Sequence, residues 1–154
     1  MGPGKYVADR SEGIARVEDL PAPLLQQRTR NYRRRGCPRC GRGASRHSTR
    51  RRVLHDLGSL RADRPCDIHL IYSKHCCKRC RVWFNAEMAD LAPPQRLDTQ
   101  RVISVAVRRV VEDPGAPGYR LASWHLWRDH RVFVPFAAIP NWIEGAGKQS
   151  GRRA

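Results

Sequence analysis

The sequence lacks any apolar run of the roughly 20 residues that a membrane-spanning helix requires. Its first residues, Met1–Lys5, lack the apolar core of a secretory signal. Lysine, aspartate and glutamate are scarce, and the six histidines form no HExxH spacing of the kind found in zinc proteases. These absences argue against membrane, secreted and metalloprotease classes. We therefore expect a cytoplasmic protein with no membrane partner.

Arginine is what the sequence holds in excess. Thirty Lys and Arg against fourteen Asp and Glu give a formal net charge of +16 over 154 residues. Such an excess goes beyond what solubility requires and indicates a polyanionic partner. The planar guanidinium suits phosphates and guanine edges, although a GC-rich genome would also raise the arginine content. We expect double-stranded DNA as the partner, with a nucleoid-associated location, and leave self-association open.

Two cysteine pairs, Cys37–Cys40 and Cys77–Cys80, have CxxC spacing with 36 residues between them. Zinc takes four ligands tetrahedrally, and a two-residue gap lets both thiolates reach one ion from a single tight turn. Gly41 can adopt the positive φ that a zinc knuckle needs. A thioredoxin-like redox pair would need a βαβ context, which is absent. The sequence predicts a zinc site with four ligands: Cys37, Cys40, Cys77 and Cys80.

Two residues beside the second pair are alternative ligands. Cys76 directly precedes Cys77, and His75 is the histidine closest in sequence to a cysteine pair. The spacing between Cys77 and Cys80 fits a knuckle better, which favours these two. Cys66 lies on the apolar face of a predicted strand, so we expect a small buried residue there.

Hydrophobic alternation with period two predicts three short antiparallel strands, at residues 53–57, 66–73 and 82–84. The middle strand has one apolar face, formed by Cys66, Ile68, Leu70 and Tyr72. Residues 24–35, with helix-forming residues and five arginines, lead into the first cysteine pair. Strands that bring two knuckles together around one ion make a zinc ribbon.

A helical period replaces the alternation after Pro93–Pro94. Asp98 or Thr99 can cap a first helix that continues to Val111. A second helix is predicted over 119–128 and a third from near Pro135, which Pro140 would kink unless that helix begins later. Three short helices indicate a helix-turn-helix unit.

The expected fold class is therefore α+β, with a small antiparallel zinc ribbon followed by a three-helix helix-turn-helix unit. We expect four segments along the chain: a flexible arm at 1–22, a basic lead-in and zinc ribbon at 23–92, the helix-turn-helix unit at 97–147, and a tail or linker at 148–154.

Arginine triplets lie on both sides of the first knuckle in sequence. Runs of one charge repel each other unless an anion is present, which favours phosphate contacts over a merely solvated face. Side chains of the third helix and the turn before it could reach a major groove. The predicted DNA-binding residues are Arg33, Arg34, Arg35, Arg50, Arg51, Arg52, Arg131, Asn141, Glu144 and Lys148. Trp83 and Phe84 are expected to pack the ribbon, with base stacking as the alternative.

The order of these motifs resembles a known family. The run CPRCG at 37–41, the run RRRVLHDL at 50–57, and Cys77–Cys80 followed by Phe84 and Glu87 are similar to the N-terminal region of bacterial zinc-ribbon insertion-sequence transposases. The likeness covers about residues 35–147. It implies zinc on the four cysteines and recognition of the element's terminal repeats. A helix-turn-helix segment follows the ribbon in that family.

Transposases of this kind continue into a domain whose acidic residues hold two metal ions for strand cleavage. The present chain has few carboxylates and ends at Ala154, so we expect it to bind DNA without cutting it, and not to act as an enzyme. The leading hypothesis is the sequence-specific DNA-binding portion of a transposase. The alternatives are a free-standing transcription regulator, an RNA-associated zinc-ribbon protein, and a nuclease with an unrecognised site.

Overall fold

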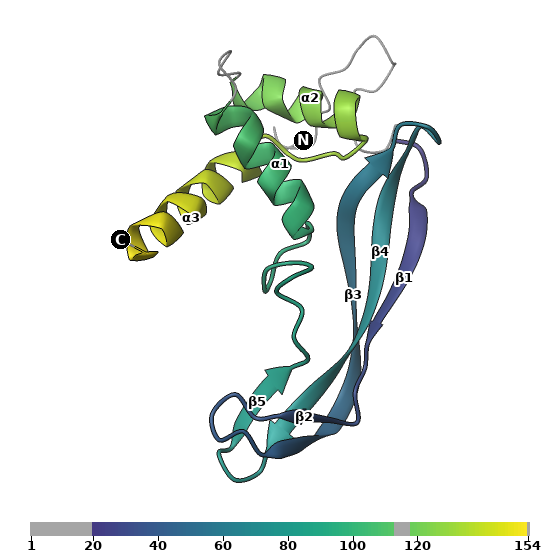
Figure 1. The fold of residues 1–154 in the computed structure, drawn as a ribbon. Coiled ribbons are helices and arrows are strands. Elements are labelled where there is room, and N and C mark those ends of the chain that lie inside the picture. Colours follow the sequence, from purple (N-terminus) through teal and green to yellow (C-terminus); the bar gives the residue numbers. More distant parts are fainter. Residues whose placement is uncertain (1–19, 113–117, 154) are drawn as a thin grey trace. The chain divides into compact units, whose positions relative to one another are not determined.

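The computed structural model describes residues 20–112 and 118–153, with side chains as far as Ala146 (Figure 1). Five strands precede three helices in this part of the chain. The elements are β1 (Leu24–Arg30), β2 (Arg34–Gly36), β3 (Gly43–Ser59), β4 (Arg64–Cys77), β5 (Val82–Asn85), α1 (Gln100–Val111), α2 (Tyr119–His130) and α3 (Ala138–Arg153). No helix in this part is long and apolar enough to cross a membrane.

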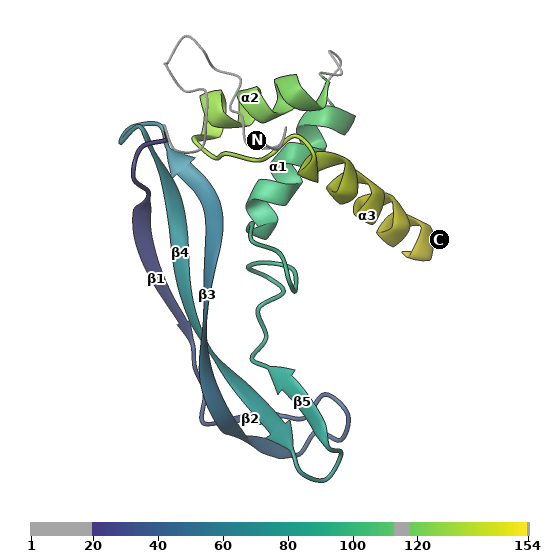
Figure 2. The same cartoon turned by 180° about the vertical axis from the view of Figure 1, so that it is seen from behind.

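The strands form one mixed sheet in the order β1-β4-β3-β2, with β5 also paired to β4. β3 and β4 make a long hairpin, so they are antiparallel. Arg64 Nε, at the start of β4, donates to Ala22 O just before β1, and Tyr32 N, just after β1, donates to Ser73 Oγ near the end of β4. β1 therefore runs parallel to β4, and Figure 2 shows both strands from behind.

The predicted fold class, a small zinc ribbon followed by a helix-turn-helix unit, is wrong. The first two predicted strands lie inside much longer ones, since β3 has 17 residues and β4 has 14, whereas the third corresponds to the short β5. Residues 24–35, predicted as a helix-forming lead-in, contain the strand β1 and the first two residues of β2. Pairing with β4 and β3 satisfies their backbone groups and outweighs local helix propensity.

The chain divides into two compact units. The sheet unit comprises residues 25–54 and 67–100, and the helical unit comprises the tip of the β3–β4 hairpin, residues 55–66, together with the helices. Leu57 of the hairpin packs on the helical core, and Arg101 of α1 donates two hydrogen bonds to the buried Asp56. The helices thus share their core with a β-hairpin and do not form the separate three-helix unit predicted from the sequence.

The helical core consists of apolar side chains from all three helices and from the α2–α3 connection. Its buried members are Val102, Ala106, Ala122, Leu126, Val132, Val134, Ile139 and Trp142.

Arg131 ends α2 in the left-handed conformation, with φ of 48°. Because α3 begins at Ala138, Pro140 lies in the first helical turn, where its missing N–H costs no helical bond. α3 includes residues 145–153, which the sequence assigned partly to a tail.

Candidate metal centre and basic surface

The first cysteine pair lies in the loop between β2 and β3. Gly36 of β2 pairs with Gly43 of β3, which closes the loop at its base. Inside it, Cys37 N donates to Arg42 O at 2.8 Å and Gly41 N donates to Cys37 O at 2.9 Å. Gly41 has φ of +75°, a conformation that glycine adopts without strain. The loop therefore has the knuckle geometry that the CPRCG run predicted.

The second pair lies in the tight turn between β4 and β5. Cys77, the last residue of β4, pairs with Val82, the first residue of β5. Arg81 before that strand has φ of 54°, which lets the chain reverse over four residues. The antiparallel register thus brings Cys80 back towards Cys77 and both towards the first loop, since β3 and β4 are neighbours in the sheet.

The four sulfur atoms lie within 4.8 Å of one another, with Cys40 Sγ 3.7 Å from Cys77 Sγ. A tetrahedral ion with metal–sulfur bonds of about 2.3 Å needs sulfurs roughly 3.8 Å apart. The cluster therefore fits such an ion with little adjustment. The cysteines Cys37, Cys40, Cys77 and Cys80 come together as predicted and could hold a metal ion.

The backbone around Cys37 favours its thiolate. The amide groups of Cys40 and Arg39 point at this sulfur, with Arg39 N at 3.4 Å, and they lower the pKa of Cys37 to about 7. Cys80 hydrogen-bonds to Cys40 and is desolvated, which raises its pKa to about 12. The thiol of Cys37 thus loses its proton more easily than an ordinary cysteine. A divalent cation bound by the four sulfurs would displace the protons of the remaining thiols.

His75 and Cys76, the two alternative ligands, lie outside the sulfur cluster. The His75 ring is buried between Ser73 Oγ, 2.7 Å from Nε2, and Ala44 O, 3.0 Å from Nδ1. Both ring nitrogens therefore have partners within the protein. Cys76 lies between His75 and Cys77 on β4, so its side chain points to the opposite sheet face, where its cross-strand partner is Trp83. Cys66 is buried, as predicted.

Exposed cations surround the cysteine cluster. Arg33, Arg34 and Arg35 directly precede the first loop, and six more exposed basic residues lie in the segments that carry the cysteines. We call the nine together the basic end: Arg33, Arg34, Arg35, Arg39, Arg42, Arg46, Lys78, Arg79 and Arg81. The sequence interpretation missed the last six because they do not form a run of basic residues. One signal was present, since segments 31–47 and 74–86 hold no acidic residue at all.

The second triplet divides into two kinds of residue. Arg50 and Arg51 are exposed on β3, and no carboxylate in the described part of the chain forms an ion pair with either. Arg52 is half-buried, and its guanidinium donates to Pro93 O and Arg96 O, each at 2.6 Å. Arg52 therefore fastens the segment after β5 to the sheet.

The predicted sites in the helical unit are not alike. Arg131 is largely buried, with its guanidinium 2.8 Å from Asp63 and 5.2 Å from the Trp127 ring centroid, so its contacts are structural. Asn141 and Glu144 are exposed on α3, three residues apart on neighbouring positions of the helix surface. The side chain of Lys148 lies outside the described residues.

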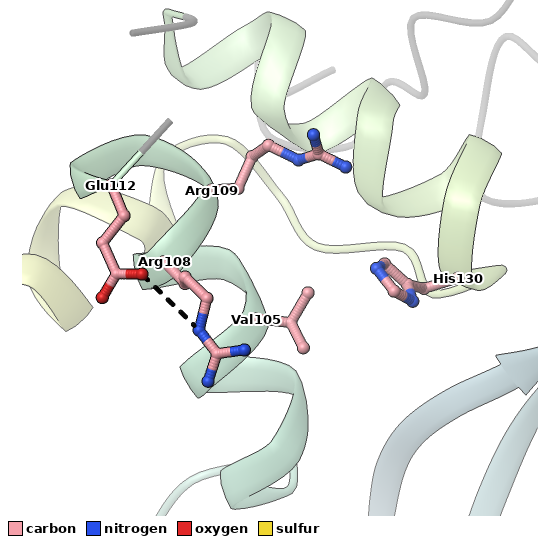
Figure 3. A pocket seen from close by; sticks show the side chains of 5 residues that line it. All are labelled: Val105, Arg108, Arg109, Glu112 and His130. Atoms are coloured by element: carbon pink, nitrogen blue, oxygen red, sulfur yellow. Dashed lines mark ion pairs between the residues drawn. The ribbon is translucent and has the colours of Figure 1, made fainter. Parts of the chain in front are cut away.

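A surface pocket of about 400 Å³ lies between α1 and the end of α2 (Figure 3). It is lined by Val105, Arg108, Arg109, Glu112 and His130. Arg108 faces Glu112 at 3.9 Å, and Arg109 forms a close ion pair with Asp129. Because carboxylates balance these arginines, the pocket is a weaker candidate for anion binding than the basic end.

No protein-family model, no curated protein and no solved structure matches this chain.

Proposed function

We propose that the four clustered cysteines bind one zinc ion and that the sheet unit binds double-stranded DNA through its phosphates. The zinc has a structural role, since all four ligand positions are filled by protein and none is left for a substrate. Its task is to hold the two loops of the basic end together. A site of this kind stabilises a small unit that has little apolar surface to bury.

The observation that carries the proposal is the charge of the sheet unit. This unit contains sixteen Lys and Arg residues and four Asp and Glu residues, a formal charge of +12 out of the +16 of the whole chain. Such a density of like charge disfavours the folded state unless a polyanion binds. Duplex DNA supplies closely spaced phosphates, and neutralising them releases counterions.

Zinc binding is tested by counting metal ions. Native mass spectrometry should find one zinc per wild-type chain, and Cys37→Ser or Cys80→Ser should lose it. Cys66→Ser and Cys76→Ser are matched controls, because these cysteines lie outside the cluster, and both variants should keep the ion. The assignment would be overturned if Cys76→Ser lost the ion while Cys80→Ser kept it.

DNA binding is tested by fluorescence anisotropy at several salt concentrations. The logarithm of the affinity should fall linearly with the logarithm of the salt concentration, and Arg34→Ala or Arg51→Ala should each reduce the slope by about 1. Arg61→Ala removes an equal charge from the helical unit and should leave the slope nearly unchanged. A salt-independent affinity, or tighter binding to structured RNA, would refute the proposal.

The narrower role expected from the transposase resemblance needs its own experiment. Selection from a random DNA pool should enrich one sequence if the protein recognises the terminal repeats of a mobile element. Alanine at Asn141 or Glu144 should then relax the enriched motif. Enrichment of a motif unrelated to any element end favours the transcription regulator. Strand cleavage in Mg²⁺ or Mn²⁺ would instead favour a nuclease.

A further inference from the structure

Trp83 is exposed where the sequence predicted a packing residue. It lies on β5 opposite Cys76, so it shares a sheet face with Lys74 and points away from the cysteine cluster. About half of the residue, 52%, is accessible to solvent. Its neighbour Phe84 points to the other face, where it stacks on His75 with ring centroids 5.3 Å apart. Phe84 therefore packs the sheet as predicted, and Trp83 does not.

Side chains from β3 and β4 border the exposed indole. The His47 ring of β3 meets it edge-on, with centroids 4.6 Å apart and planes at 88°. Lys74 Nζ of β4 lies over the indole, 5.2 Å from the ring centroid. Arg34 belongs to the same face, because it pairs with Ser45, two residues from His47 on β3. The indole thus lies on the sheet surface with the Lys74 ammonium close to it, and Arg34 adds positive charge to the same face.

A flat aromatic ring with a cation beside it matches the two parts of a nucleotide. A base can stack on the indole while Lys74 meets the phosphate of the same nucleotide. Bases within a duplex already stack on each other, so an indole on a sheet surface is available only to a base that has left the stack. A protein partner would instead favour an apolar surround, which Lys74 and His47 do not provide.

We propose that Trp83, with His47 and Lys74, is a stacking site for an unpaired nucleobase. The inference rests on the proposed function, because phosphate contacts at the basic end would bring the base to the indole. It adds a preference to that function, namely that DNA with a single-stranded extension binds more tightly than the same duplex with blunt ends.

The test compares a blunt duplex with the same duplex carrying a thymine overhang, using the zinc-loaded full chain. The wild type should bind the overhang DNA roughly ten-fold more tightly, as expected for one stacked base. Trp83→Ala should remove this preference and leave the affinity for blunt duplex unchanged, whereas Trp83→Phe should keep most of it. Leu60→Ala, which truncates another exposed apolar residue, is the matched control and should keep the full preference.

Tryptophan fluorescence gives a second measurement. Oligothymidine should quench the wild type, and the quenching should disappear in Trp83→Ala. The inference is overturned if Trp83→Ala keeps the wild-type ratio of affinities, or if it weakens blunt and overhang DNA equally. If the wild type binds neither DNA at low salt, the proposed function itself fails. These outcomes separate the stacking site from the phosphate surface.

Discussion

His75 Nδ1 lies 3.0 Å from the carbonyl oxygen of Ala44 and joins β4 to β3 beneath the cysteine cluster. A carbonyl only accepts hydrogen bonds, so Nδ1 carries the proton and donates. In the neutral ring Nε2 is then the acceptor for the Ser73 hydroxyl at 2.7 Å. The histidine beside the second CxxC pair therefore joins the two strands and uses both ring nitrogens for protein contacts, outside the sulfur cluster.

We expect His75→Ala to destabilise the protein by about 2–4 kcal/mol without changing the zinc content. The substitution leaves Ala44 O and Ser73 Oγ without their buried partner and opens a cavity beside Phe84. Thermal unfolding and metal analysis of the same sample would measure both effects. Cys76→Ser, on the opposite sheet face, should change neither by much. Loss of zinc from a still-folded His75→Ala protein would make the histidine a ligand.

Gly58→Ala should destabilise the helical unit by about 2 kcal/mol or more, because a Cβ at this position would overlap backbone. It would lie 2.7 Å from Arg64 O and closer still to Arg131 O, and neither can move easily. Near-UV circular dichroism of the helical-unit tryptophans during thermal unfolding would report the loss. Gly43→Ala is the control, since its Cβ would meet only Arg34 Cδ at 3.8 Å.

The neighbours Arg51 and Arg52 should respond in opposite ways to alanine. Arg52→Ala removes two hydrogen bonds to the carbonyls of Pro93 and Arg96 and should cost about 1–3 kcal/mol of stability. Arg51→Ala should leave the unfolding temperature unchanged and weaken DNA binding. Denaturant unfolding and anisotropy on both variants provide the comparison. Equal loss of stability in the two would contradict this division of roles.

Chelation of zinc should release the loops of the metal centre. In the part of the chain that the structure describes, the apolar cluster here consists of Ala44, Phe84 and three of the cysteines, which is too little to hold the loops without the ion. Hydrogen exchange should accelerate over residues 34–47 and 74–86. Residues around Leu54, Ile68 and Leu70, which form a separate core, should remain protected longer. Unchanged protection of both segments after chelation would argue against a structural metal.

Asp129 should make the helical unit acid-sensitive. Hydrogen bonding from Arg128, and the charges of Arg128 and Arg109, lower the pKa of this carboxyl below its ordinary value. The stabilisation, about 1 kcal/mol after screening by solvent, is present above the unfolded pKa and lost as the pH falls through the folded pKa. Asp129→Asn should therefore be less stable than wild type at neutral pH and equal to it in acid, in pH-dependent urea unfolding.

Glu112→Gln is the control for that experiment. Its pair with Arg108 spans 3.9 Å between two exposed side chains, so its loss should change stability little at any pH. A constant difference between Asp129→Asn and wild type across the pH range would assign the effect to packing.

Local spacing sufficed for the cysteines and the helices. The sequence predicted two CxxC knuckles, and the structure confirms that their four sulfurs form one cluster. This prediction needed only residues close in sequence, because each knuckle takes both of its cysteines from one turn. α1 follows the predicted helix from Gln100 to Val111 because its apolar residues have the helical period. The ligand alternatives left open at His75 and Cys76 needed the sheet register.

The sequence analysis underestimated the lengths of β3 and β4 for a physical reason. Residues 43–52 of β3 are mostly polar and exposed, so they carry no alternation for a sequence pattern to detect. In β4 the buried positions are even-numbered up to Leu70 and odd-numbered from Ser73, which interrupts period two. Both strands are long because they pair with each other, and that pairing is a non-local interaction.

The sequence by itself determined which four cysteines cluster, the charge excess and the helical periods, all of which depend on residue type and short spacing. Tertiary structure alone decided which arginines are exposed and which are structural, as Arg51 and Arg52 illustrate. It also turned Trp83 outward and gave both nitrogens of His75 a partner. These outcomes depend on strand register, since a shift of one residue would exchange the two faces of the sheet.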